Sequence, residues 1–394
     1  MTDDRDEREA FRAEVRSWLD EHAPAKGSPE DFSAAHLVSA MTREAFEAAE
    51  RSALEVTQRW QRTLHEAGYA GRSWPEEYGG QGAPEWQSAV LAEEQVRYGV
   101  STKMLAIALE MAPPVLLRHG THEQRRAHLP SIVRGDEAWC QLLSEPDAGS
   151  DLTNVQTLAT AVDGGWSVTG QKVWTSGAGA ADFALLLART DRSKPGREGV
   201  SCFAMPMRQD GVTVRPLRQM SGGYHFNEVF LDGTLVDEGG LIGDLGEGFA
   251  VLRTMLASER AAIGGGTSAR SATQLRALAI ELGRSSEPLV RQALARAHTR
   301  ERLLDLVGAR AASVPTGGSI VKLLYSEHAR LSGDAALAIL GPAAMVVDHP
   351  VAAPWLDRFL FAPGLRLGGG TDEIQRNTIA ERGLGLPREP RPAG

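Results

Sequence analysis

The chain has 394 residues, of which 42% are hydrophobic and 24% are charged, as is typical of a globular protein with two or three domains. Its formal net charge of −9 and its lack of a long block of Lys or Arg argue against nucleic-acid binding. Charges or glycines interrupt the apolar runs well before the roughly 18 residues that a membrane span needs. Residues 1–9 contain no apolar segment of a secretory signal, so we expect a cytoplasmic protein with no membrane span.

The cysteines and histidines give no sign of a metal site. Cys140 and Cys202 are the only two cysteines, and their spacing does not match a metal-ligand pattern. The ten histidines show no ligand spacing either. We therefore expect neither a metal centre nor a disulfide framework.

The first third of the chain has the apolar periodicity of amphipathic helices. Phe11, Val15, Trp18 and Leu19 recur at the i, i+4, i+7 and i+8 spacing of one helical face. Similar patterns predict helices over 42–67, after Pro84 and over about 102–118. A loop over 74–82, rich in Gly, separates the second of these helices from the third.

The pattern changes near Gly135. Short runs of β-forming residues between turn signals predict strands at 165–170, 183–188, 201–207, 211–216 and 227–232. From Gly248 onward, helical patterns return at about 249–282, 287–311, 319–340 and 372–383. We therefore predict an α+β fold with an N-terminal α-helical domain over 1–135, a central β-barrel domain over 136–241 and a C-terminal four-helix bundle over 242–388.

The segment Leu143-Ser144-Glu145-Pro146-Asp147-Ala148-Gly149-Ser150-Asp151 is a turn built from small residues. Small residues let backbone N–H groups approach a planar ring or a phosphate closely. The same residues are also compatible with an ordinary surface turn built from Pro-Asp and Gly-Ser. Trp174 lies in the segment Val168-Thr169-Gly170-Gln171-Lys172-Val173-Trp174-Thr175-Ser176. Taken by itself, a Trp at such a position is more often a core-packing residue than part of a binding site.

These two segments, together with Trp74-Pro75-Glu76-Glu77-Tyr78-Gly79-Gly80 and Gly370-Thr371-Asp372-Glu373-Ile374-Gln375-Arg376, resemble the acyl-CoA dehydrogenase family in order and spacing. The resemblance covers nearly the whole chain. It implies the three-domain fold of that family, an FAD cofactor, and α,β-desaturation of an acyl-CoA thioester by α-proton abstraction and β-hydride transfer to flavin N5.

The resemblance also implies roles for individual residues. Ser144 and the nearby backbone would contact the pyrimidine end of FAD, Trp174 would cover the isoalloxazine, and Ser176 would hydrogen-bond flavin N5. Ser150 would lie beside the CoA chain, and Arg260 would contact the substrate. The full set of implied cofactor-binding residues is Gln141, Leu143, Ser144, Gly149, Ser150, Trp174, Thr175, Ser176, Thr371 and Glu373.

The chain departs from the family at the catalytic base. Many members have a Glu directly before the Gly-Thr step, where this chain has Gly369, whose backbone N–H can still polarise the thioester carbonyl. In some relatives the base is a Glu followed by Arg at the start of a C-terminal helix, and Glu259-Arg260 matches that pattern. Two interpretations stay open: Glu259 is the catalytic base, or Glu259 and Arg260 form a structural pair.

A second departure concerns assembly. Homotetrameric members contact a neighbour's FAD through Arg-x-x-Phe-Gly and Gln-x-x-Gly-Gly-x-Gly segments, and neither 281–288 nor 338–344 matches them. In this respect the chain resembles actinobacterial dehydrogenases that assemble from two unlike chains, some of which act on steroid side-chain CoA thioesters. We expect a homo- or hetero-tetramer, an acyl-CoA substrate, and an electron-transfer flavoprotein or a similar acceptor. Two alternatives remain: a non-catalytic partner subunit, and a desaturase of a carrier-protein thioester in secondary metabolism.

Overall fold

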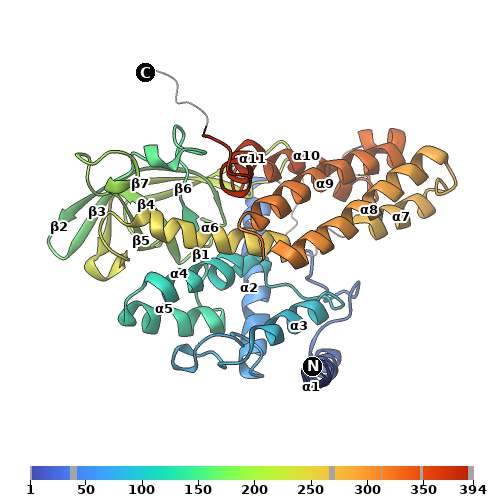
Figure 1. Ribbon diagram of the computed structural model, residues 1–394, viewed down its shortest axis with the longest axis horizontal. Helices are drawn as coiled ribbons and strands as arrows, with labels where there is room; N and C mark the ends of the chain where they lie inside the picture. The colour runs from blue at the N-terminus through green and yellow to red at the C-terminus, as the bar shows by residue number, and fades with distance from the viewer. Residues whose placement is uncertain (1, 36–41, 266–270, 312, 347–348, 389–394) are drawn as a thin grey trace. The chain divides into compact units, whose positions relative to one another are not determined.

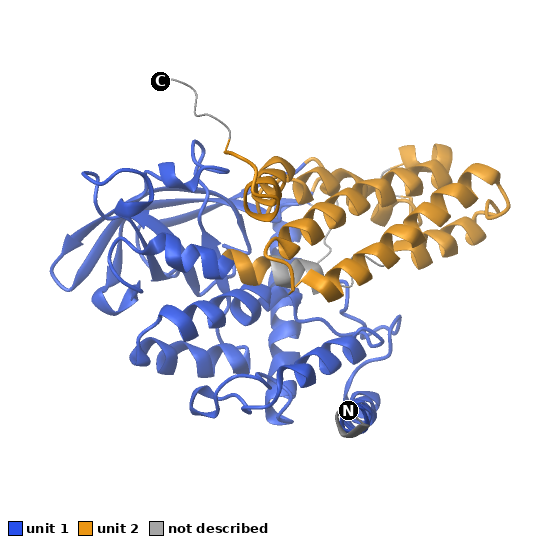
Figure 2. Ribbon diagram, viewed as in Figure 1, with its two compact units in different colours: residues 1–219, 223–255 blue, residues 220–222, 256–394 orange. Residues whose placement is uncertain are grey.

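The computed structural model describes residues 2–35, 42–265, 271–311, 313–346 and 349–388 (Figure 1). The chain divides into two compact units (Figure 2). The first contains residues 1–219 and 223–255, and the second contains residues 220–222 and 256–394. The predicted order of a helical part, a sheet and a second helical part is confirmed. No helix in the described ranges is long and apolar enough to cross a membrane.

The helices of the first third of the chain are α1 (Thr2–His22), α2 (Arg43–Glu66), α3 (Glu85–Gln95), α4 (Ala112–His119) and α5 (His122–Arg134). Of these, α1, α2 and α3 follow the predicted periodicity. Helix α2 begins after Thr42, whose hydroxyl accepts a hydrogen bond from the backbone N–H of Ala45. Apolar side chains of α1, α2 and α3, among them Val15, Trp60 and Leu91, share one core.

The chain is helical from Lys103 to His119, close to the predicted 102–118, but this stretch is not one regular α-helix. The structure has a short 3-10 turn at Lys103–Leu105, a π-helical segment at Ile107–Met111, and then α4. Pro113 and Pro114 explain the break, because proline has no N–H to donate and is tolerated only in the first turn of a helix. Helix α5 was not predicted from the sequence.

The central sheet has eight strands in the first unit. They are β1 (Trp139–Leu142), β2 (Leu158–Val162), β3 (Gly165–Ser176), β4 (Phe183–Arg189), β5 (Val200–Pro206), β6 (Val212–Leu217), β7 (Phe226–Asp237) and β8 (Leu241–Ile242). Their order is β6-β7-β3-β2-β4-β5-β8, and β1 pairs in parallel with β4. The long strand β3 pairs antiparallel with β2 on one side and with β7 on the other.

Burial explains why these segments become strands. Every residue of β5 from Val200 to Met205 is buried, and so are the β4 residues after Phe183, which is the pattern of strands covered on both faces. Leu186 and Phe203, on neighbouring strands, belong to a core with Val229 of β7. A rigid sheet of this kind can hold the turns at its strand ends in fixed positions.

Helix α6 (Gly248–Gly265) belongs to the first unit up to Met255 and to the second from Leu256. The second unit continues with α7 (Ser271–Glu281), α8 (Pro288–Ala311), α9 (Gly317–Leu340), α10 (Ala353–Leu365) and α11 (Asp372–Thr378). Helices α7, α8 and α10 each pack against α9 (Figure 1). Of the stretch predicted over 249–282, residues 266–270 lie outside the described residues.

Candidate active site

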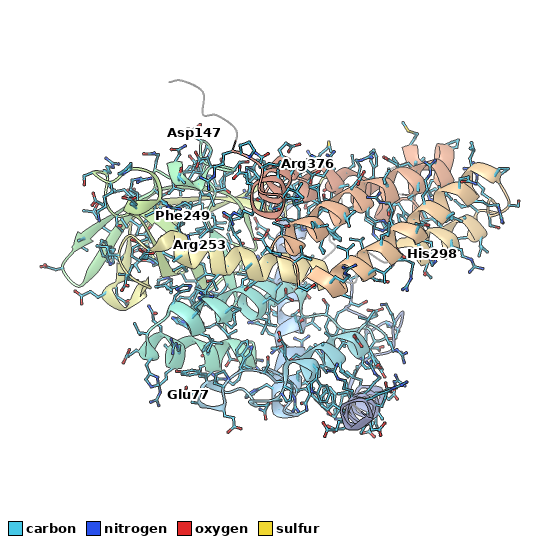
Figure 3. The ribbon with its side chains drawn as sticks, viewed as in Figure 1. Glu77, Asp147, Phe249, Arg253, His298 and Arg376 are labelled. Atoms are coloured by element: carbon cyan, nitrogen blue, oxygen red, sulfur yellow. The ribbon has the colours of Figure 1, made fainter. Side chains whose placement is uncertain are left out.

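The turn that follows β1 is anchored by a buried ion pair. The Lys172 ammonium on β3 donates to the Glu145 carboxylate at 2.9 Å, to the Leu143 carbonyl at 3.0 Å and to the Leu187 carbonyl at 2.7 Å. The same carboxylate accepts the backbone N–H groups of Gln156 and Thr157. The turn is therefore bound to the sheet from several directions, while Asp147 at its tip projects from the surface (Figure 3).

Burial and charge act against each other in this ion pair. Burial alone would raise the pKa of Glu145, but the Lys172 ammonium and the donors at Thr157 and Gln156 outweigh it and hold that pKa below its usual value. Burial lowers the pKa of Lys172 to about 8, and Glu145 opposes that shift. Both groups are therefore charged at neutral pH.

The turn is also joined directly to the strand segment that contains Trp174. The backbone N–H of Val173 donates to the Ser144 carbonyl at 2.9 Å, so Ser144 lies beside Trp174. Gln141, on β1, donates its side-chain amide to the Met111 sulfur, and Leu143 packs against the same core as Met111. The structure thus brings Ser144 beside the β3 segment that contains Trp174, while Gln141 and Leu143 belong to the same stretch of chain as Ser144.

Trp174 has an unusual conformation. Among the described residues it is the only one other than glycine with a positive φ, at 62°. A bulky side chain rarely adopts this left-handed conformation, which costs on the order of 1–3 kcal/mol. Its side chain is nevertheless 62% exposed, with its ring edge toward Phe226 at a centroid distance of 6.0 Å. A strained backbone that displays a large aromatic ring on the surface indicates a ligand-binding site.

The residues around Trp174 suit a planar ring carrying polar edges. Thr175 is buried, and its hydroxyl has no hydrogen-bond partner among the described residues, whereas Ser176 is exposed. A Cβ built at Gly149 or Gly177 would meet no atom within 4 Å, so both glycines border open space. Ser150, next to Gly149, is exposed as well. These features fit the FAD that the sequence predicts.

The C-terminal motif forms a tight turn before α11. Gly369 and Gly370 both have positive φ, at 66° and 90°. The side-chain amide of Gln375 donates to the Gly369 carbonyl at 2.8 Å, and Thr371 caps α11 by accepting the N–H of Ile374. Glu373 is exposed and lies 3.6 Å from Arg376.

Asp372 anchors this turn, a role that the sequence analysis missed. Its carboxylate accepts hydrogen bonds from Lys322 at 3.2 Å, Ser326 at 2.9 Å and Arg366 at 2.6 Å. Burial alone would raise the pKa of Asp372, but these donors outweigh burial and lower it. The Asp of Gly-Thr-Asp-Glu therefore fixes the backbone at Gly369 and Gly370.

Glu259, the predicted base, lies in α6 and is partly buried, with an interaction of its own. The side chain of Arg260 lies outside the described residues. Glu259, Gly369, Thr371 and Glu373 belong to the second unit, and Ser144, Trp174 and Ser176 belong to the first. Their assigned roles stay predictions.

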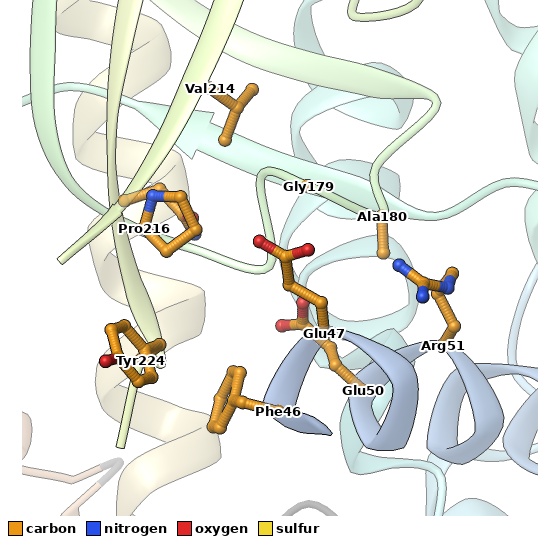
Figure 4. A pocket seen from close by; sticks show the side chains of 10 residues that line it. Phe46, Glu47, Glu50, Arg51, Gly179, Ala180, Val214, Pro216 and Tyr224 are labelled. Carbon is orange, nitrogen blue, oxygen red and sulfur yellow. The ribbon is translucent and has the colours of Figure 1, made fainter. Parts of the chain in front are cut away.

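A cavity of about 230 Å³ lies between the start of α2 and strands β6 and β7 (Figure 4). Phe46, Glu47, Glu50 and Tyr224 line it, together with Asn227, which also contacts Thr175. Burial and the neighbouring Glu47 raise the pKa of Glu50. The cavity is smaller than the roughly 300–1,000 Å³ of typical ligand pockets, so it is no place for a whole acyl-CoA.

Sequence reasoning also missed Lys172 and Asn227. A signal existed for Lys172, because it has the same parity on β3 as buried Val168, and a charge on the inward face of a strand requires a buried partner. For Asn227 we find no comparable signal, because its partner is 52 residues away.

Models of the acyl-CoA dehydrogenase N-terminal, middle and C-terminal domains match residues 5–136, 140–233 and 246–384. The chain is 34% identical to acyl-CoA dehydrogenase IpdE1 of Mycolicibacterium smegmatis over 96% of this chain and 98% of the relative. It is 35% identical to IpdE1 of Mycobacterium tuberculosis over 97% and 98%.

Two solved structures also resemble the chain along nearly its whole length. The Tcur3481-Tcur3483 steroid ACAD superposes with a TM-score of 0.80 at 27% identity, covering 98% of both chains. The ChsE4-ChsE5 complex from Mycobacterium tuberculosis has a TM-score of 0.77 at 27% identity, covering 97% of this chain and 98% of that one. With matches along nearly its whole length, the chain belongs to the acyl-CoA dehydrogenase family, oxidoreductases that act on acyl-CoA.

Proposed function

We propose that the chain binds FAD against Trp174 and catalyses the α,β-desaturation of an acyl-CoA thioester. The observation that supports this most is Trp174 itself, exposed at a left-handed φ beside Ser144 and two residues before Ser176. Residues with strained backbone conformations cluster at functional sites, and an exposed aromatic ring at such a position is suited to contact a ligand. The bound FAD would supply a two-electron acceptor.

Residues of this chain would have the following roles in binding and catalysis. Ser144, Trp174 and Ser176 hold the cofactor, and the Ser176 hydroxyl donates a hydrogen bond to its ring. Glu259 accepts the α proton of the thioester. The backbone N–H of Gly369 donates to the thioester carbonyl and makes the α proton more acidic, which is the type of electrostatic stabilisation that gives the largest rate effects.

The proposed substrate is a CoA thioester with a bulky, steroid-derived acyl group, and the proposed assembly is a tetramer of two unlike chains. Similarity to a steroid ACAD and to a two-chain complex supports both proposals. The missing neighbour-contact motifs at 281–288 and 338–344 support the second. The partner chain would then supply contacts to the FAD pyrophosphate and adenosine.

The test is anaerobic reduction of the purified holoprotein. We expect a steroid side-chain CoA thioester to bleach the flavin absorbance faster than a straight-chain acyl-CoA of similar length. The protein is expressed alone and with a homologue encoded next to it, and native mass and flavin content are measured for each. Full activity as a homotetramer with one FAD per chain would refute the two-chain assembly, and no flavin in either preparation would refute the function.

A second candidate is a non-catalytic subunit that shapes a partner's pocket, which Gly369 in place of a Glu favours. Substitution of Glu259 separates the two. If this chain is catalytic, Glu259→Gln abolishes bleaching in the complex, and if it is a scaffold, bleaching persists. Reoxidation of the reduced protein by an electron-transfer flavoprotein, compared with oxygen, tests the proposed acceptor.

A further inference from the structure

Strand β7 lies beside the strained part of β3, and the pairing of the two strands is irregular there. Lys172 pairs with Val229 and Thr175 pairs with Asn227, so three steps along β3 correspond to two along β7. One residue of β3 is therefore extra, which is the definition of a β-bulge. Trp174, with its φ of 62°, lies inside this bulge. Such a bulge needs specific contacts to persist, because its residues leave the regular ladder.

Asn227 provides a contact of this kind on the core side. Its side-chain amide donates to the Thr175 carbonyl at 3.0 Å, and only 3% of Asn227 is exposed. The Thr175 hydroxyl cannot take this role, since it has no hydrogen-bond partner among the described residues. Removing a buried donor of this type destabilises the carbonyl group that it holds.

Phe226 provides a contact on the other side. Successive side chains of a strand point to opposite faces, so Phe226 and Asn227 act on different sides of the same backbone. Phe226 meets the edge of the Trp174 ring at an interplanar angle of 86°. One residue of β7 thus fixes the backbone after Trp174, while its neighbour fixes the ring.

We propose that Asn227 is a positioning residue for the surface formed by Trp174 and Ser176, against which the cofactor would bind. Its amide holds the Thr175 carbonyl and so fixes the bulge that displays both residues. The inference rests on the proposed FAD site. Asn227 also lines the cavity at the start of α2.

The test uses Asn227→Leu, which removes the donor and keeps a similar volume. Thr234→Val is the matched control, because Thr234 is a fully buried residue of β7 whose hydroxyl has no partner among the described residues. We expect Asn227→Leu to weaken FAD binding at least tenfold and Thr234→Val to leave it unchanged. Should Asn227→Leu fail to fold, Asn227→Ala is tested in its place.

A second readout needs no cofactor. The chain has eight tryptophans, so the fluorescence of Trp174 is obtained in apoprotein by subtracting the matching Trp174→Phe protein. We expect Asn227→Leu to shift the emission of Trp174 and its quenching by acrylamide, whereas Thr234→Val shifts neither. An unchanged Trp174 signal with unchanged FAD affinity in Asn227→Leu would overturn the proposal. Failure of the wild-type chain to bind FAD would instead refute the proposed function, since the apoprotein readout remains.

Discussion

The left-handed backbone at Trp174 predicts an inverted preference between alanine and glycine. At an ordinary strand position, glycine destabilises a protein by roughly 0.5–1 kcal/mol relative to alanine. At a positive φ, a Cβ costs about 1–2 kcal/mol that glycine avoids. After the entropy cost of glycine is subtracted, Trp174→Gly should be more stable than Trp174→Ala by about 0.5–1 kcal/mol.

The side chain itself cancels from this comparison. Trp174 is 62% exposed, and within the described part of the chain its ring makes one aromatic contact, a T-shaped one with Phe226. Both substitutions lose that contact, which is worth about 0.5–1.5 kcal/mol for an aromatic pair. The difference between the two variants then reports the backbone alone.

The assay is thermal and urea unfolding of the apoprotein, with Gln171→Ala and Gln171→Gly as the matched pair. Gln171 lies on the same strand, pairs regularly with Phe230 and has no positive φ. We expect alanine to be the more stable at Gln171 and glycine at Trp174, with melting temperatures separated by roughly 1 °C at each position. If alanine is the more stable at both positions, the strain assigned to Trp174 does not exist.

Four further outcomes are expected. Glu259→Gln should leave the flavin spectrum intact and lower turnover by several orders of magnitude, whereas near-normal flavin reduction would rule out Glu259 as the base. A carboxylate restored by Gly369→Glu in that background would be strained by the φ of 66°, so we expect at most partial rescue, read as the rate of flavin bleaching. Lys172→Met should destabilise the fold by about 3–5 kcal/mol, because it leaves Glu145 buried and unpaired. Adding Glu145→Gln should recover part of this loss in a double-mutant cycle of unfolding free energies. Strictly additive effects of the two substitutions would contradict the pairing. The pKa values of Glu145 and Asp372 are lowered in the folded protein, so both carboxylates stabilise the fold. This stabilisation is fully present above the unfolded-state pKa near 4 and is lost as the pH falls through the folded-state pKa values. The unfolding free energy of Glu145→Gln should therefore fall less steeply with acid than that of the wild type.

Local patterns in the sequence were sufficient for most of the helices, α5 excepted, and for at least part of each longer strand. The apolar spacing from Phe11 to Leu19 predicts α1, and the alternation after Gly165 predicts the start of β3, because both depend on neighbours within a few residues. The same reasoning failed where proline changed the hydrogen bonding, at the segment before α4. Resemblance to a family then assigned roles to Ser144, Trp174 and Ser176.

Tertiary structure alone decided how those residues are held. The contacts that hold the turn and the bulge join Glu145 to Lys172 across 27 residues and Thr175 to Asn227 across 52. Nothing in local periodicity indicates such pairs, and the positive φ of Trp174 depends on the strand beside it. The physical reason is that a buried charge or a strained backbone is stable only with partners that folding brings from elsewhere in the chain.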